Sequence, residues 1–143
     1  MYSSVLLSVS LLAVPAETSK TTNAAAVASV VDRQLAAYNA HALDDFMAFF
    51  APDAALFEFP DKPLAKGIAE IRKRYEARFA EPNLHVEIVS RIVMGDKVID
   101  RERIRRTFPE GPGTWNVVTT YEVKGGRVTR VWFIIGETVL DRK

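Results

Sequence analysis

The feature that most constrains the fold of this chain is a change in hydrophobic spacing at Pro82. Before Pro82, apolar residues recur every three or four positions, which is the spacing of one face of an α-helix. After it, apolar and polar residues alternate, which is typical of strands with one buried face. Helices followed by strands favour an α+β domain over a series of parallel βαβ units.

Three helices are predicted in the N-terminal half. The first starts at Thr22 or Asn23, either of which can cap it, and one of its faces carries Val27, Val30, Val31, Gln34, Leu35 and Tyr38. The second covers 43–50 and is stopped by Pro52. The third covers 67–80. Each helix has one apolar face, so we expect all three to pack on the same side of a sheet.

The strands are predicted as one short strand at 54–59 and a meander of four long strands. The long strands cover 84–94, 97–108, 114–123 and 127–139. They are joined by a tight turn at Gly95-Asp96, a wider loop over 109–113 and a turn at Gly125-Gly126. A long twisted sheet curls around the helices that cover it, and we expect a ligand cavity at its open end.

The composition is that of one folded domain. The chain has 143 residues, of which 48% are hydrophobic, enough for a single core. Its formal net charge is +1, so neither nucleic acid nor an anionic membrane is expected as a partner. Cysteine is absent, which excludes disulfides and thiol nucleophiles, and His41 and His85 lack the spacing of a metal site. We expect neither a metal nor a cofactor.

Residues 1–22 are interpreted as a leader and a polar tether that precede a single domain at 23–143. The apolar run at 5–14 is too short to span a bilayer but has the length of the apolar part of a signal peptide. Cleavage after Ala16 would release a periplasmic or secreted protein. The alternative is an uncleaved leader on a cytoplasmic protein.

Several short motifs resemble the NTF2-like superfamily, and more narrowly its SnoaL-like and ketosteroid-isomerase-like proteins. The residues that carry the resemblance are Phe-Phe-Ala-Pro-Asp-Ala-Ala-Leu-Phe-Glu at 49–58, Gly67, Tyr75, Tyr-Glu-Val-Lys-Gly-Gly-Arg-Val at 121–128 and Val-Trp-Phe at 131–133. The similarity covers residues 24–137. It implies an α+β, NTF2-like (cystatin-like) cone in which three N-terminal helices pack on a curved antiparallel sheet.

The same resemblance implies where a catalytic site would lie. Glu58 occupies the position of the family's catalytic base, a carboxylate that moves a proton between carbons of an enone. Tyr75 matches a tyrosine of the supporting hydrogen-bond network. Gln34 replaces the tyrosine, and Thr119 the aspartic acid, that hold the enolate oxygen. Because an enolate needs strong, preorganised donors, we do not expect ketosteroid isomerisation itself.

Two further acids, Asp100 and Glu102, share one face of the predicted strand 97–108. The opposite face carries Arg101, Arg103 and Arg105. Burying three arginines would cost more than burying two carboxylates, one of which can stay protonated. We therefore expect Glu102 to point into the cavity opposite Glu58, with Asp100 nearer the edge. The alternative is a buried ion pair with Arg72, Arg74 or Arg106.

These residues lead to one main hypothesis of function. The protein would be a SnoaL-like small-molecule-binding protein, and as an enzyme a cofactor-independent isomerase, cyclase or hydratase acting on an apolar carbonyl compound. Glu58 would be the general base and Glu102 the second catalytic acid. The pocket would be completed by Gln34, Tyr38, Tyr75, Asp100, Trp115, Thr119 and Phe133.

Two alternatives remain open. The first is a non-catalytic ligand-binding or dimerisation module of the same fold. The second is an epoxide-hydrolase-like site of two acids and an arginine, which the spacing of Asp100 and Glu102 does not favour.

The convex face of the sheet is the expected contact with a second copy of the chain. The three arginines there lack the interleaved aromatic residues of a nucleic-acid site. Val118 and Trp132 are expected on the same face, where two large apolar side chains would be costly to expose. The resemblance also implies dimers that pair through this sheet, so we expect a homodimer.

Overall fold

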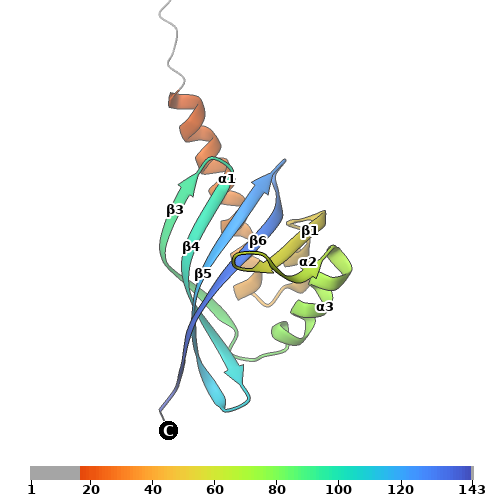
Figure 1. Cartoon of the computed structure of the whole chain (residues 1–143), viewed down its shortest axis with the longest axis vertical. Helices are drawn as coiled ribbons and strands as arrows, with labels where there is room; N and C mark the ends of the chain where they lie inside the picture. Colours follow the sequence, from red (N-terminus) through yellow and green to blue (C-terminus); the bar gives the residue numbers. More distant parts are fainter. Residues whose placement is uncertain (1–16, 143) are drawn as a thin grey trace, which may run out of the picture.

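A computed structural model describes residues 17–142 of the chain, with side chains from Asn23 onward. Its helices are α1 (Glu17–Asn39), α2 (Leu43–Met47) and α3 (Ile68–Phe79). Its strands are β1 (Phe50–Glu58), β2 (Lys62–Lys66), β3 (His85–Met94), β4 (Lys97–Phe108), β5 (Gly111–Lys124) and β6 (Arg127–Leu140). The six strands form one curved sheet against which the helices pack (Figure 1).

The strand order is β2-β1-β6-β5-β4-β3, so the last strand lies in the interior of the sheet. Four neighbouring pairs are antiparallel, but β1 runs parallel to β6, with Leu56 paired to Val131. The predicted antiparallel sheet is therefore corrected to a mixed one. Parallel neighbours need a long connection, and the chain supplies it here through α3 and the three strands that follow.

The β1–β2 hairpin is longer than the short strand predicted at 54–59. Strand β1 already begins at Phe50, and β2 was not predicted because Pro63 lacks a backbone donor. The structure makes β2 an edge strand, where a proline is tolerated because one side of the strand has no neighbour. Phe50, expected in the second helix, thus belongs to the sheet.

The helices differ from prediction mainly at their ends. Helix α1 begins at Glu17, so the predicted tether at 17–22 is helical, while the predicted leader and the cut after Ala16 lie outside the described residues. Helix α3 matches its prediction to within a residue at each end. It follows β1 and β2 in the chain, so the helices do not all precede the sheet.

The hairpin turns form where glycine was predicted to allow them. Gly95 has a φ of 60° between β3 and β4, and Gly125 and Gly126 have φ values of 59° and 73° between β5 and β6. The wide loop predicted over 109–113 is shorter, because β5 already begins at Gly111.

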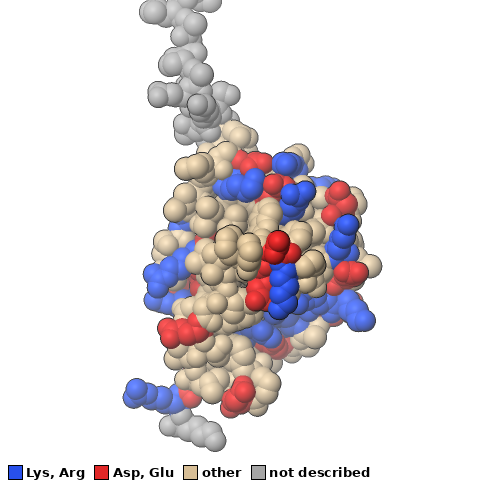
Figure 2. Space-filling view, in the orientation of Figure 1, with Lys and Arg blue, Asp and Glu red and all other residues tan. Residues whose placement is uncertain are grey.

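The core lies between the helices and the concave face of the sheet. Its centre is an aromatic cluster in which neighbouring ring centroids lie 4.7 to 6.5 Å apart, formed by Tyr38, Phe46, Phe50, Tyr75 and Phe79. Among residues 17–142, no helix is long and apolar enough to cross a membrane. Acidic and basic side chains are interspersed on the face shown in Figure 2.

Candidate functional site

Alternation along β4 brings its two acids to the concave face. Asp100 is completely buried and Glu102 is only 3% exposed, whereas Arg101 and Arg103 on the opposite face are exposed. A strand turns successive side chains to opposite faces, so the apolar residues at 98 and 104 fix the direction of both acids. The inward orientation expected for Glu102 is therefore observed.

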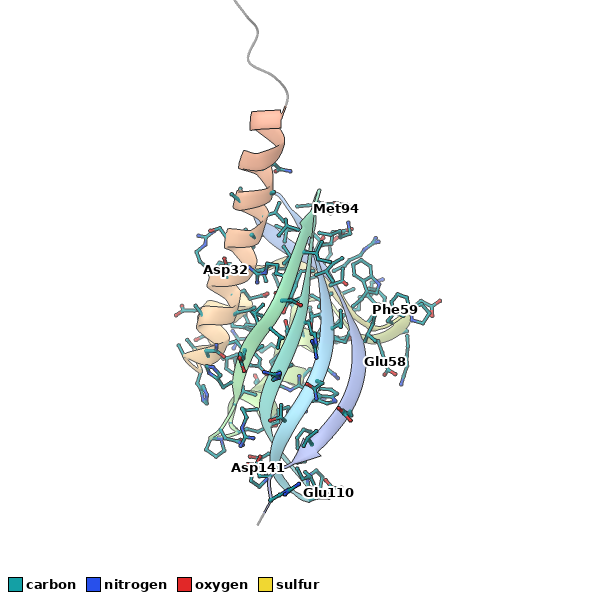
Figure 3. All side chains as sticks on the ribbon, turned by 90° about the vertical axis from the view of Figure 1, so that its left-hand side faces the viewer. Asp32, Glu58, Phe59, Met94, Glu110 and Asp141 are labelled. Atoms are coloured by element: carbon teal, nitrogen blue, oxygen red, sulfur yellow. The ribbon has the colours of Figure 1, made fainter. Side chains whose placement is uncertain are left out.

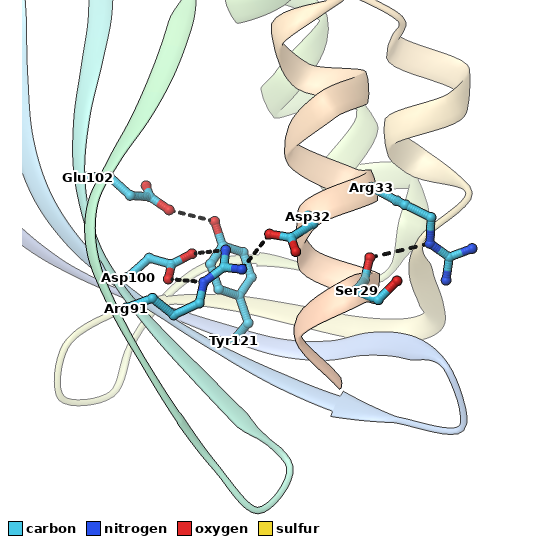
Figure 4. A network of polar contacts seen from close by, with 7 residues as sticks. All are labelled: Ser29, Asp32, Arg33, Arg91, Asp100, Glu102 and Tyr121. Atoms are coloured by element: carbon cyan, nitrogen blue, oxygen red, sulfur yellow. Dashed lines mark hydrogen bonds and ion pairs between the residues drawn. The ribbon is translucent and has the colours of Figure 1, made fainter. Parts of the chain in front are cut away.

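Glu102 accepts two hydrogen bonds from the neighbouring strand β5. The hydroxyl of Tyr121 donates to Oε1 and that of Thr119 donates to Oε2, each at 2.8 Å (Figure 4 shows the Tyr121 bond). Burial raises the pKa of Glu102, and the two hydroxyl donors only partly oppose this, leaving a pKa of about 7. Glu102 can therefore take up or release a proton near neutral pH.

A small cavity of about 30 Å³ lies beside Glu102. Both the helices and the sheet contribute to its walls. The lining includes Gln34, Tyr38, Tyr75, Glu102, Tyr121 and Phe133. The volume is sufficient for one or two molecules the size of water, so a larger ligand requires some lining side chains to move.

Two polar side chains in this wall have no partner. Both amide atoms of Gln34 and the hydroxyl of Tyr38 are buried without a hydrogen bond among the described residues. Buried polar groups are normally hydrogen-bonded because leaving them unpaired costs stability. Burial also raises the pKa of Tyr38, so its hydroxyl stays neutral and remains a donor. Together with Glu102, these groups offer hydrogen bonds to a polar group of a ligand.

Glu58 does not join this site. Its side chain is 38% exposed and forms an ion pair of 3.1 Å with Lys62 across the β1–β2 turn. Figure 3 shows Glu58 at the periphery of the molecule, next to the exposed Phe59. The expected position of Glu58 opposite Glu102 is therefore corrected: β1 ends at Glu58, and Lys62 holds the carboxylate in solvent.

Asp100 forms a buried ion pair instead of lining the cavity. Both of its oxygens accept from Arg91, at 2.6 Å to Nε and 2.7 Å to Nη2. Arg91 also bonds to Asp32 of α1, so the pair connects the sheet to a helix (Figure 4). An ion pair was the alternative expected for these acids. The partner is Arg91 of the adjacent strand, however, and not any of the three arginines considered.

The remaining predicted pocket residues divide into three groups. Gln34, Tyr38, Tyr75 and Phe133 line the cavity. Thr119 is buried and reaches the cavity only through its bond to Glu102. Trp115 lines a neighbouring cavity that shares Phe133. Among the described residues, no three His, Asp or Glu side chains gather as a metal site requires.

Tyr121 and Arg78 also belong to this site, although neither was predicted as a site residue. Tyr121 lies two residues after Thr119 on β5, so the two side chains share the inward face of the sheet. Arg78 lies near the end of α3 and lines the cavity. The sequence could have indicated Arg78, because it follows Tyr75 by three residues and the two side chains therefore lie next to each other on one helix face.

Comparison with known proteins agrees with this architecture. Residues 31–131 match the family model of the SnoaL-like domain. Among solved structures, the chain is similar to an uncharacterised cystatin-fold protein from Novosphingobium aromaticivorans, at 27% identity and a TM-score of 0.69, over 76% of this chain and 97% of that one. No curated protein matches the chain.

Two further solved structures resemble the fold. A Delta 5-3-ketosteroid isomerase from Mycobacterium sp. is 17% identical with a TM-score of 0.65, over 76% of this chain and 91% of that one. A Mycobacterium tuberculosis protein in complex with estradiol-17beta-hemisuccinate is 18% identical with a TM-score of 0.66, over 76% of this chain and 92% of that one. At these identities the similarity establishes the fold alone.

Proposed function

The chain belongs to the SnoaL-like domain family, and on that premise we propose that its cavity binds a small, largely apolar carbonyl compound on which Glu102 acts as a general acid and base. The observation that carries the proposal is a buried carboxylate, with a pKa of about 7, that lines a cavity next to two polar side chains for which the described part of the chain supplies no partner. A group with this pKa is suited to proton transfer at neutral pH.

In the proposed reaction, the carboxylate of Glu102 removes a proton from a carbon next to the carbonyl group. The electron pair of that C–H bond moves toward the carbonyl oxygen, which accepts hydrogen bonds from the Gln34 amide and the Tyr38 hydroxyl. Glu102 then returns the proton to another carbon, as in an isomerase, or to a leaving oxygen, as in a lyase. The step consumes no oxidant or reductant.

Glu102 takes the role that the sequence assigned to Glu58. Glu58 is exposed and paired with Lys62, so it lacks the burial that would favour a carboxylate as a general base. The apolar lining of the cavity supports an apolar ligand. The estradiol-17beta-hemisuccinate bound to a solved protein of the same fold is also consistent with such a ligand.

The matched variants Glu102→Gln and Glu58→Gln test this proposal on a panel of enones and epoxides. We expect Glu102→Gln to lower turnover by about a hundredfold or more, the usual contribution of a general acid or base. Glu58→Gln should keep full activity. Unchanged turnover in Glu102→Gln would disprove the role of Glu102.

A second candidate function is ligand binding without chemistry. The observation in its favour is that Thr119 and Tyr121 already occupy both oxygens of Glu102, as in a polar network that serves to fix the core. A ligand that co-purifies unchanged, with no pH-dependent turnover of the panel, would favour this function.

We also propose that two copies of the chain pair through the face of the sheet opposite the helices. Six residues, one from each strand, form a mostly apolar row across this face. Each residue pairs with the next one on the neighbouring strand, in the order Ile92, Ile99, Thr120, Trp132, Phe57 and Pro63. Phe57 and Trp132 stack with their ring centroids 5.8 Å apart. Ile134, one row further along, is 47% exposed. Apolar rows of this kind are typical of protein interfaces.

A further inference from the structure

Three arginines gather beside the cavity, and we call Arg74, Arg78 and Arg106 the arginine cluster. The guanidinium carbon of Arg78 lies 5.7 Å from the ring centroids of both Tyr75 and Trp115. That of Arg106 lies 5.6 Å from the same Trp115 ring. Contact with aromatic faces holds a guanidinium in place while leaving its N–H groups free to donate.

The arginine cluster has three positive charges but few carboxylates bonded to it. Within residues 17–142, the carboxylate that bonds to it is that of Glu81, which accepts from Arg106 at 2.5 and 3.3 Å. Among residues 23–142, the guanidinium of Arg78 forms no hydrogen bond or ion pair, and Nε of Arg74 is buried without a partner. Burial, with repulsion from the other two arginines, lowers the pKa of Arg74. Glu81 attracts the Arg78 guanidinium at longer range, but in the described chain no carboxylate bonds to Arg74 or to Arg78.

These two groups border two adjoining cavities. Arg78 lines the inner cavity beside Glu102, and both Arg74 and Arg78 line a second cavity of about 10 Å³. The second cavity lies nearer the surface, since Ile135 in its wall is 40% exposed. Arg78, Ile104 and Phe133 line both. Movement of Phe133 would join the two spaces into one elongated site with a cationic outer part and an apolar inner part.

We infer that the natural ligand is a small organic acid, with its carboxylate bound by Arg74 and Arg78 and its apolar body directed inward toward Gln34 and Glu102. This inference rests on the proposed function of the cavity and names the class of substrate. A guanidinium matches the planar fork of a carboxylate and forms paired hydrogen bonds with it. The anion would bond directly to both guanidinium groups and accept from Nε of Arg74, which has no partner among the described residues.

The walls favour a carboxylate on an apolar body over a free inorganic anion. The second cavity is lined by Leu64, Val117, Phe133 and Ile135 in addition to the arginines. A strongly hydrated phosphate would gain little from such walls, whereas an apolar chain or ring gains about 25 cal/mol for each Å² of apolar surface that it buries.

Matched acids and amides provide the test. Binding of phenylbutyrate and of phenylbutyramide to the whole protein is measured by calorimetry at neutral pH and low salt. We expect the acid to bind about tenfold more tightly than the amide, and added salt to reduce this preference. Arg78→Gln and Arg74→Gln should each reduce the ratio toward one, because each weakens binding of the acid more than binding of the amide.

Two control variants make the result specific. Lys73→Gln removes an exposed charge from the same helix and should keep the preference. Arg78→Lys retains the positive charge but lacks the planar fork of the guanidinium, so this variant should keep part of the preference for the acid. Equal binding of acid and amide to the unchanged protein would overturn the inference, as would a preference that survives both arginine substitutions.

The outcomes also separate this inference from the proposed function. One outcome is that the protein binds acid and amide equally and that Val131→Phe, which fills the cavity, abolishes binding of the amide. This outcome overturns the organic-acid inference but leaves the cavity as a ligand site. Binding of neither compound overturns the organic-acid inference and removes support for the cavity as a ligand site. Loss of turnover in Glu102→Gln with an unchanged acid-to-amide ratio supports both.

Discussion

The hydroxyl of Tyr121 donates a hydrogen bond of 2.8 Å to Oε1 of Glu102. The two residues lie on neighbouring antiparallel strands, and both side chains are buried. The bond stabilises the ionised form of Glu102, so it opposes the effect of burial on the pKa of that carboxyl. Tyr121 is therefore a positioning residue that also tunes how readily Glu102 holds its proton.

Replacing Tyr121 by Phe should raise the pKa of Glu102 above its value of about 7. The variant removes a donor to the carboxylate and leaves burial, the larger influence, unchanged. The pKa is measured by carbon NMR of the isotopically labelled Glu102 carboxyl group during a pH titration. Thr120→Val, on the opposite face of β5, serves as the control and should leave the pKa unchanged. A lower pKa in Tyr121→Phe would contradict the assignment.

The raised pKa of Glu102 should weaken folding as the pH rises from 4.5 to about 7. Within this window the folded chain keeps a proton that the unfolded chain has lost, so the free energy of unfolding decreases with increasing pH. The full effect is about 3 kcal/mol. Glu102→Gln mimics the protonated form, and urea unfolding across the window should show a flatter profile for this variant. A profile parallel to that of the unchanged protein would refute the shift.

Glu122 should act in the opposite direction at acid pH. Burial alone would raise its pKa, but the Thr129 hydroxyl and the Lys97 ammonium outweigh burial and lower the pKa to about 2. Its stabilising contribution is therefore lost as the pH falls from 4.5 toward 2. Lys97→Met should move acid unfolding to higher pH, as followed by circular dichroism. Lys124→Met, whose ammonium is more exposed and more distant, should move it less.

Replacing Arg91 by Met should lower the free energy of unfolding by about 3–5 kcal/mol, because Asp100 would be left buried and unpaired. Adding Asp100→Leu to this variant should recover much of the loss. Asp32→Asn removes only the exposed arm of the same network and should cost less than about 1 kcal/mol. Chemical denaturation measures all three, and an equal cost for Arg91→Met and Asp32→Asn would show that burial of Asp100 is unimportant.

Ile134→Lys should dissociate the proposed dimer. The side chain lies on the face of the sheet opposite the helices, where a charge would have to be buried on pairing. Sedimentation equilibrium should report a dimer for the unchanged chain and a monomer for this variant. Ala36→Lys on the exposed side of α1 should remain dimeric. A monomeric unchanged chain would refute the proposed interface.

Much of the fold could be predicted because local spacing determines it. The hairpin turns at Gly95 and at Gly125 follow from glycine between alternating strands, and helix α3 follows from its periodicity. The parallel pairing of β1 with β6 could not be predicted, since residues more than 70 positions apart in sequence make it and no local pattern encodes it. Strand β2 was not predicted because it contains a proline, and proline is unfavourable in a strand unless that strand lies at the edge of a sheet.

The candidate site was predictable only to the level of strand faces. Alternation placed Glu102 inward, but it could not reveal that Arg91 would neutralise Asp100 or that Lys62 would hold Glu58 in solvent. Those outcomes depend on which side chains meet across strands and turns. Arg74 and Arg106 were considered only as partners of the buried acids. Their gathering with Arg78 was not predicted, because Arg78 and Arg106 come from different elements and lie against the same ring of Trp115.

The interior position of β6 has a consequence for how the molecule is assembled. Strand β6 separates β1 from β5, so the N-terminal hairpin has no neighbour in the sheet until residues 127–140 have been synthesised. Such distant pairing slows folding and leaves strand edges open to wrong partners in the meantime. We therefore expect the nascent chain to depend on chaperones until β6 inserts, and the cavity, whose wall includes Val131 and Phe133, to form last.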